Sequence, residues 1–395
     1  MNELRFTACN DSDDILESLK PFNSNRPEHA QVQLHWIPWD HQKQELNAIA
    51  LYGKGGDVSQ VGGPLVSDLV AMNALRPFTS REIEVLGGAS AFSQVAWSNS
   101  RRTADGNVYA VPWIIDPRAI FYWRDLLGNA GVDESTAFIS FEQMEETLSK
   151  LQAGGVETPW ALALSGGFFS VQPACTWIWG AGGDIGNETE LLLQRPEGLR
   201  GLKKYFSLYR FMPKAIQSLD AAHTYNELFA KRQVAVTMGS LAMLLSIKKS
   251  LAPDLQKNLG VALAPGPLFV GSSSLVIWKN TRNEADAVNL VQYMLSDEAQ
   301  KEYCARAGYL PARLNLLMSP PYSTDPDLKV FTQSVFNGRS LGSFKLSGLF
   351  EELLSAAIGR IWTKLYANPD LDLDATILEE LMPIARRISL WSESS

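Results

Sequence analysis

The sequence offers few side chains with the spacing that catalysis or metal binding requires. No HExxH pair occurs among its four histidines, and no Gly-x-Ser-x-Gly turn marks a nucleophilic serine. The turn at residues 53–56 is glycine-rich but lacks the Lys-Ser/Thr ending of a phosphate-binding loop, so we interpret it as the end of a helix. Carboxylates are plentiful, yet no spacing singles out an acid/base pair. We therefore expect no catalytic residue, no metal site and no cofactor.

The three cysteines, Cys9, Cys175 and Cys304, are far apart and form no CxxC motif. We expect them to be small buried hydrophobic residues and not a disulfide framework.

Aromatic residues beside glycines and short polar residues are the more informative feature. The chain has 11 Trp, 11 Tyr and 17 Phe, with clusters at residues 36–40, 113–116, 168–169 and 177–184. A sugar stacks its C–H faces on flat apolar rings, and its hydroxyls bind Asp, Asn, Arg and main-chain groups. This mixture is typical of a small-molecule cleft, although any one of these rings could instead belong to a core.

Alternating elements in the first 75 residues would position several of these groups. Strands are predicted over residues 4–8, 32–37 and 57–61, each followed by a helix. The order predicts a parallel, doubly wound sheet, in which ligands bind at the carboxyl ends of the strands. Residues 10–11, 36–40 and 62–65 should then lie at one rim.

Local signals set the expected helix ends. Pro21 should stop the first helix, Asp40 should cap a second one that ends at Gly53, and Pro64 should open the third. Capping boxes are predicted at 79–82 and 140–143, a helix pair divided at Ser296 over 283–305, and an amphipathic helix over 347–365.

Length and charge narrow the class of protein. A chain of 395 residues exceeds one hydrophobic core, so two lobes are expected, and with no repeat or linker they should exchange segments. The net charge of −8 argues against a nucleic-acid partner. No apolar run is long enough to span a bilayer. The first residues do not form a signal peptide, so the chain is either cytoplasmic or a mature exported form.

Several ordered blocks resemble the extracellular solute-binding proteins of bacterial ABC importers, in the branch that includes maltose-binding protein. The blocks cover residues 56–64, 106–113, 121–127, 177–184, 233–239, 271–277, 295–300 and 308–313. No block is decisive alone, but their order and spacing extend over nearly the whole chain.

The resemblance implies an α/β fold of the periplasmic-binding-protein-like type II class: two doubly wound lobes joined by a multi-strand hinge. Lobe one would be residues 1–111 plus 268–318, and lobe two 112–267 plus 319–395. It also implies a monomer, periplasmic or membrane-anchored outside the cell, whose lobes close over a sugar and deliver it to a membrane permease.

Carried over by position, the resemblance gives a set of ligand-binding candidates and no catalytic one. They are Asn10, Asp11, Trp39, Asp40, Gly63, Pro64, Leu65, Trp113, Asp116, Phe168, Phe169, Trp177, Gly182, Gly183, Ser240, Gly271, Ser272, Arg313 and Phe344. Asp116 matches a sugar-binding carboxylate, although it could instead cap a helix over 117–124.

One departure concerns the residues after Gly239. Sugar-binding relatives usually carry a Trp there, where this chain has Ser240-Leu241-Ala242-Met243, and Phe344 could supply a ring instead. The ligand could therefore be a polyol, a glycerophosphodiester or a polyamine. Two other classes stay open: a glycan-active enzyme using Asp116 with Asp40 or Asp184, and a structural or sensory protein.

Overall fold

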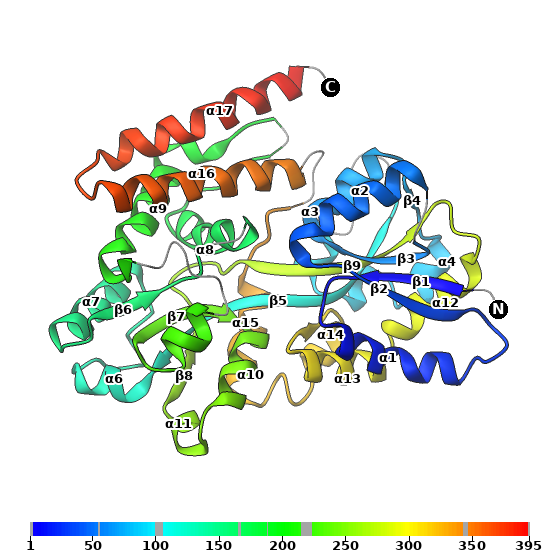
Figure 1. Ribbon diagram of the computed structural model, residues 1–395, viewed down its shortest axis with the longest axis horizontal. Coiled ribbons are helices and arrows are strands. Elements are labelled where there is room, and N and C mark those ends of the chain that lie inside the picture. The colour runs from blue at the N-terminus through cyan, green and yellow to red at the C-terminus, as the bar shows by residue number, and fades with distance from the viewer. Residues whose placement is uncertain are drawn as a thin grey trace. The chain divides into compact units, whose positions relative to one another are not determined.

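The computed structural model describes residues 3–53, 56–98, 106–164, 167–187, 189–214, 223–342 and 347–393. The chain divides into two compact units (Figure 1). The first unit comprises Met1–Asp116, Val270–Phe336 and Ser340–Gly348, and the second comprises Pro117–Phe269, Asn337–Arg339 and Leu349–Ser395. Each unit therefore contains segments that are distant in the sequence, as expected from the lack of a linker.

The sheet of the first unit begins with three parallel strands. β1 (Glu3–Ala8) pairs in parallel with both β2 (Gln31–Trp36) and β3 (Val58–Gly62), which confirms the predicted parallel arrangement. β9 (Val270–Trp278) is antiparallel to β3, and β4 (Leu75–Arg76) is antiparallel to β9. The strands carry buried apolar side chains because helices cover the sheet.

Helices connect and cover these strands. The longer ones in the first unit are α1 (Ser12–Ser24), α2 (Gln42–Tyr52), α3 (Gly63–Ala71), α12 (Glu284–Met294), α13 (Asp297–Ala307) and α15 (Pro326–Asn337). Shorter elements are η1 (Trp39–His41), α4 (Ser80–Val85), η2 (Ala89–Ala91), α5 (Gln94–Ser98), β10 (Leu310–Pro311) and α14 (Leu314–Leu317).

Most of the predicted helix ends are confirmed. Thr79 and Glu82 form the capping box of α4, and Ser296 caps α13. A further cap, which was not predicted, is Asp11 at the start of α1. Gly53 ends α2 with φ of 61°, a left-handed conformation that favours glycine.

Two predicted helix ends are wrong. α1 continues past Pro21 to Ser24, because buried Phe22 anchors the last turn and the Pro21 carbonyl still accepts a hydrogen bond from the Asn25 N–H (3.0 Å). Asp40 does not cap α2, because the 3-10 turn η1 precedes that helix and places His41 at the cap.

The second unit has a smaller mixed sheet. β7 (Val234–Ser240) is antiparallel to the second half of β5 (Ala110–Trp123) and parallel to β6 (Thr158–Ala161), and β8 (Leu259–Ala262) also pairs antiparallel with β5. Its helices include α6 (Arg124–Asn129), α7 (Phe141–Ala153), α8 (Gly167–Gly180), α9 (Pro196–Ser207), α10 (Leu241–Ser250), α11 (Pro253–Lys257), most of α16 (Ser347–Ala367) and α17 (Leu373–Glu393). The remaining turns are η3 (Leu192–Gln194), η4 (Leu208–Phe211) and the π-helix η6 (His223–Phe229).

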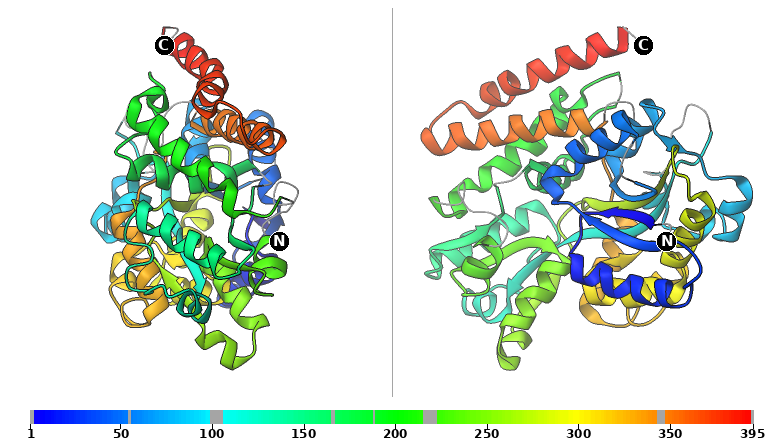
Figure 2. Two further views of the ribbon diagram at one scale, coloured as in Figure 1. Left: turned by 90° about the vertical axis from the view of Figure 1, so that its left-hand side faces the viewer. Right: turned by 45° about the vertical axis from the view of Figure 1, so that its right-hand side comes forward.

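Helices α16 and α17 lie side by side, orange and red in Figure 2. Ion pairs join them: Arg360 to Glu380 (2.6 Å) and Lys364 to Glu379 (3.2 Å). The buried face of α16 carries Trp362, which meets the ring of Tyr205 on α9 edge-on, with centroids 5.4 Å apart. The amphipathic helix predicted over 347–365 is therefore confirmed.

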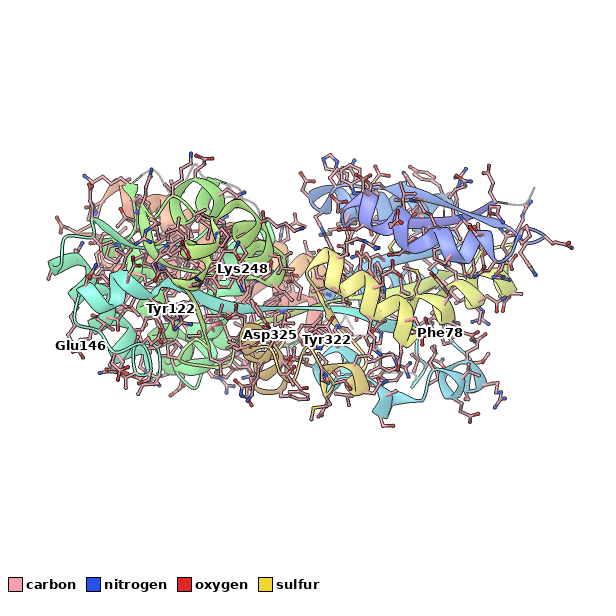
Figure 3. All side chains as sticks on the ribbon, turned by 90° about the horizontal axis from the view of Figure 1, so that it is seen from below. Phe78, Tyr122, Glu146, Lys248, Tyr322 and Asp325 are labelled. Carbon is pink, nitrogen blue, oxygen red and sulfur yellow. The ribbon has the colours of Figure 1, made fainter. Side chains whose placement is uncertain are left out.

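The chain passes between the units at places that differ from those expected. β5 runs unbroken through Asp116 and Pro117, so the helix considered over 117–124 does not form, and the boundary between the two units falls within this strand. Residues 319–336, expected in lobe two, belong to the first unit. Tyr322 (labelled in Figure 3) is buried there, close enough to the Cys304 thiol of α13 to interact with it electrostatically. The Tyr322 carbonyl accepts a hydrogen bond from the Thr332 hydroxyl (3.1 Å).

The three cysteines are buried free thiols, as predicted. Among the described helices, none is long and apolar enough to cross a membrane.

Candidate functional site

Four strands of the first unit bring the predicted rim together. β1, β2 and β3 are parallel, so their carboxyl ends share one edge, and antiparallel β9 begins at that same edge. The register fixes this, with Ala8 opposite Trp36 and Gly62 opposite Ser273. The segments 10–11, 36–40, 62–65 and 271–272 therefore gather at one end of the sheet.

Two tryptophans are exposed at this rim. Trp36, the last residue of β2, is 48% exposed, and Trp39 in η1 is 39% exposed. The Trp36 indole N–H donates to the Asn10 carbonyl (2.8 Å). The Trp39 ring lies beside Gly62, where an added Cβ would be 3.9 Å from the Trp39 Cζ3. The rim thus presents two half-exposed rings, of which Trp36 was missing from the predicted site residues.

Asn10 is buried below these rings, with 2% of its surface exposed. Its Nδ2 donates to the Tyr303 hydroxyl (2.6 Å), and its Oδ1 accepts from Gln60 Nε2 (3.0 Å) and from the Tyr309 hydroxyl (3.2 Å). The amide of Asn10 therefore faces the interior, and the expected direct contact with a ligand is not supported.

Gln60 extends this buried network. It is fully buried in β3, its Oε1 accepts from the Cys9 N–H (3.0 Å), and its Nε2 also donates to Ser273 Oγ (3.1 Å). Gln42 at the start of α2 donates to Cys9 Sγ (3.0 Å). Burial raises the pKa of the Cys9 thiol to about 12, so this sulfur stays protonated at neutral pH. The network joins β1, β3, α2 and β9 directly below the rim.

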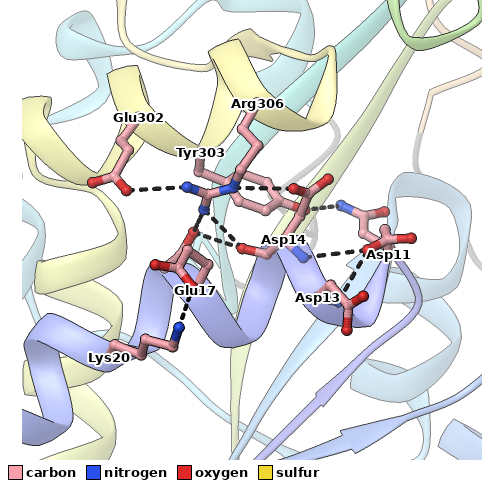
Figure 4. Close-up of polar contacts among 10 residues, drawn as sticks. Asp11, Asp13, Asp14, Glu17, Lys20, Glu302, Tyr303 and Arg306 are labelled. Atoms are coloured by element: carbon pink, nitrogen blue, oxygen red, sulfur yellow. Dashed lines mark hydrogen bonds and ion pairs between the residues drawn. The ribbon is translucent and has the colours of Figure 1, made fainter. Parts of the chain in front are cut away.

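Asp11 lies at the rim and is exposed, but one of its carboxylate oxygens caps α1. Oδ1 accepts from the N–H groups of Asp13 (3.0 Å) and Asp14 (3.2 Å). Figure 4 shows how α1 is anchored: Arg306 of α13 pairs with the Asp14 carboxylate (3.0 Å) and donates to the Asp14 carbonyl (2.8 Å). The cap and this anchor hold Asp11 at a fixed place on the edge.

The first turn of α3 supplies main-chain groups at the rim. Its N-cap is Gly62, which has no side chain, and Gly63, Pro64 and Leu65 follow. Unpaired N–H groups at a helix start attract oxygen acceptors. The Pro64 carbonyl accepts from the Ser347 hydroxyl (2.6 Å), and Leu65 is buried. The Leu65 side chain therefore packs in the core and not at the rim.

Asp116 ends the first of the three segments of the first unit and is half-buried within β5. β10 pairs antiparallel with β5, with Leu310 opposite Ile115, the residue before Asp116. Asp116 therefore lies within a paired strand and not at a helix cap.

Two other candidates of this unit have structural roles. Trp113 is 1% exposed, because its ring stacks on Tyr303 with centroids 4.7 Å apart. Arg313 pairs with Asp297 (3.0 Å) and donates to the Leu86 carbonyl (3.2 Å). Arg313 lies beyond β10 as the N-cap residue of α14, and these contacts occupy its guanidinium.

Candidates of the second unit are mostly buried. Trp177 is 1% exposed, since the rings of Phe141, Trp160 and Tyr205 surround it. The indole is therefore part of the core and presents no face to solvent.

Three smaller candidates of this unit follow local structure. Gly183 lies where an added Cβ would be 2.7 Å from the Gly198 N, so glycine permits close packing there. Gly182 has φ of 82° in the preceding turn. Ser240 is buried and caps α10 by accepting from the Met243 N–H (3.4 Å).

Three aromatic candidates lie outside what can be described. Phe168 and Phe169 are in the first turn of α8, and their side chains lie outside the described residues, as does Phe344.

Asp184 and Asp40, two of the carboxylates considered for acid/base chemistry, have different surroundings. Asp184 pairs with Arg339 (2.8 Å) and accepts from the Trp179 indole N–H (3.2 Å) and from the Ile185 N–H (2.8 Å). Asp40 is exposed in η1. Within the described residues, no three His, Cys, Asp or Glu side chains could hold a metal ion.

One buried carboxyl was not anticipated. Glu351 of α16 is 2% exposed, and burial raises its pKa to about 8. It acts on the nearby Cys175 thiol of α8, whose pKa is raised by burial and by this carboxyl. The sequence signal was a Glu on the same helix face as buried Leu354 and Ile358.

Comparisons with known proteins agree with this architecture. Residues 17–330 match the model of the bacterial extracellular solute-binding protein family. A Brucella abortus protein that carries the name of a binding protein is 23% identical over 326 residues, which is 80% of this chain and 76% of the relative.

Two solved structures show the same fold. The GacH receptor of Streptomyces glaucescens has a TM-score of 0.82 at 18% identity, with 98% of each chain covered. The protein MalE of Xanthomonas citri has a TM-score of 0.84 at 18% identity, again with 98% of each chain covered. They confirm the type II fold class. With a family model matched over most of its length, the chain belongs to the bacterial extracellular solute-binding proteins.

Proposed function

We propose that this protein is an extracytoplasmic carbohydrate-binding protein that delivers its ligand to an ABC permease. The observation that carries the proposal is the pair of exposed rings, Trp36 and Trp39, at the carboxyl ends of parallel strands. Flat apolar faces beside polar groups suit a sugar, whose C–H faces stack on rings while its hydroxyls accept and donate hydrogen bonds.

Polar groups around the rings would bind the hydroxyls. Asp11 and Asp116 offer carboxylate acceptors, the first turn of α3 offers main-chain donors, and the start of β9 offers Gly271 and Ser272, both half-buried. Relatives of the same fold support this ligand class, since GacH was solved with acarbose and MalE is described as a sugar-binding protein.

The ligand is released unchanged in this proposal. Asp184, one partner in the rival acid/base pair, is held by Arg339 and by two hydrogen-bond donors. A carboxylate so occupied is a poor general base, because its lone pairs already accept hydrogen bonds. We also propose that the protein acts as a monomer outside the cytoplasm, either free in the periplasm or anchored to a membrane.

A binding screen tests the proposal. Maltose, acarbose and N,N′-diacetylchitobiose would be compared with spermidine and glycerophosphocholine by thermal shift and calorimetry. A ligand at about 100 times its Kd adds about 2.7 kcal/mol to the free energy of unfolding. We expect at least one carbohydrate to bind and to be recovered intact by chromatography.

A matched pair of variants locates the site. Replacing both Trp36 and Trp39 with Ala should abolish the shift, whereas Tyr52→Ala, which removes a 74% exposed ring at the far end of α2, should not. A shift with spermidine or glycerophosphocholine and none with a carbohydrate would refute the proposed ligand class.

A further inference from the structure

We propose that Asn10 is a positioning residue that fixes the plane of the Trp36 ring and does not touch the ligand. The inference deepens the proposed carbohydrate binding and rests on it. A platform whose plane is set in advance would select the orientation of a bound sugar ring, because a freely turning indole would lose entropy on binding.

Trp36 is 48% exposed, so few side chains restrain its faces, and an exposed Trp would ordinarily turn about its two side-chain torsions. Its single polar atom, Nε1, is bonded inward to the Asn10 carbonyl at 2.8 Å. The pairing of Trp36 with Ala8 fixes the backbone, and this hydrogen bond fixes the ring.

The Asn10 carbonyl, which accepts this bond, lies between the end of β1 and the cap of α1. β1 ends at Ala8, and the Cys9 N–H bonds to a side chain, Gln60, instead of a neighbouring strand. Between Ala8 and the cap of α1 at Asp11, the backbone is therefore held by side chains and not by the sheet ladder alone.

Asn10 is held in place by the hydrogen bonds of its side chain. Its amide makes three hydrogen bonds, to Tyr303 on α13, to Gln60 on β3, and to Tyr309 just before β10. These partners lie 293, 50 and 299 residues away in the chain, so they tie the end of β1 to distant parts of the chain. With 2% of its surface exposed and these bonds made, Asn10 acts on the ligand through Trp36.

The experiment measures ring position and affinity separately. In the full chain labelled with ¹⁵N-tryptophan, Trp36→Phe assigns the Trp36 indole signal. We expect that N–H to exchange slowly with solvent although its ring is exposed, and Asn10→Ala to shift the signal and speed its exchange. Tyr303→Phe, which removes one hydroxyl, gives a milder form of the same change if Asn10→Ala folds poorly.

Affinity is then measured with the best binder among maltose, acarbose and N,N′-diacetylchitobiose. Trp36→Ala should weaken binding by roughly tenfold or more, the size expected for losing an aromatic contact. Asn10→Ala should weaken it by about threefold to tenfold, the size of one net hydrogen bond. In a Trp36→Ala background, Asn10→Ala should have no further effect, because the ring through which it acts is gone.

The outcomes separate the two proposals. If wild-type protein binds a carbohydrate but Asn10→Ala weakens binding equally with and without the Trp36 ring, Asn10 contacts the ligand and the positioning role is wrong. Unchanged affinity and indole exchange in Asn10→Ala and Tyr303→Phe would also overturn it. If the wild type binds none of the three sugars, the proposed function fails first, and the inference falls with it.

Discussion

Glu351 should make the free energy of unfolding depend on pH. The carboxyl lies on α16 with 2% of its surface exposed, and its Oε2 has no hydrogen-bond partner among the described residues. Glu351 lies close enough to the Cys175 thiol to help raise its pKa, and burial is the larger cause of that shift. Burial raises the pKa of Glu351 from 4.5 to about 8.

The direction of this pH dependence follows from the protonation of Glu351 in the folded and in the unfolded protein. Below pH 4.5 the carboxyl is neutral in both states, so its ionisation costs nothing. Between about pH 4.5 and 8 the unfolded chain releases the proton while the folded protein keeps it, so the free energy of unfolding falls as pH rises. At 1.36 kcal/mol per pKa unit, the loss above pH 8 amounts to about 5 kcal/mol.

Urea unfolding of wild type and Glu351→Gln at pH 5, 7 and 9, followed by circular dichroism, measures this effect. The amide cannot ionise, so the variant should be more stable than wild type by several kcal/mol at pH 9 and nearly equal to it at pH 5. Glu352→Gln changes the exposed neighbour and should track the wild type at every pH. Parallel pH profiles for wild type and Glu351→Gln would refute the reasoning.

Two further predictions concern the second unit. Trp177→Ala should lower the free energy of unfolding by about 3–5 kcal/mol while leaving carbohydrate affinity unchanged below the melting temperature, because the ring is core; a large loss of affinity in a still-folded variant would contradict this. Gly201→Ala should destabilise by about 1–3 kcal/mol, because its Cβ would be 2.5 Å from the Ile178 Cα, whereas Gly359→Ala, with open space around it, serves as the control.

The sequence predicted the elements whose signals are local. These are the β-α alternation of the first 75 residues, the Gly53 helix end and the Ser296 division, which depend on residues within one or two turns. The helix considered over 117–124 failed for the opposite reason. Pairing of β5 with β7 and β8, whose residues are more than 100 positions away, overrides the helix-starting tendency of Pro117.

The site was predicted less well because the burial of a ring is decided by distant partners. Trp113 is covered by Tyr303 and Trp177 by Tyr205, while Trp36 at the end of an edge strand is left half-exposed. The three residues look alike in sequence, each near a polar residue and a turn. The role of Asn10 was equally hidden, since two of its three partners are more than 290 residues away.

The structure gives a reason why no tryptophan directly follows Gly239. Ser240 is buried, pairs with Arg118 across β7 and β5, and caps α10, so an indole at this position would have to displace the strand or the helix start. The two exposed rings among the rim residues, Trp36 and Trp39, both belong to the first unit. If they bind the sugar as proposed, the stacking energy comes from rings of the first unit. The stacking energy lost in Trp36→Ala should then not be compensated by any ring at position 240.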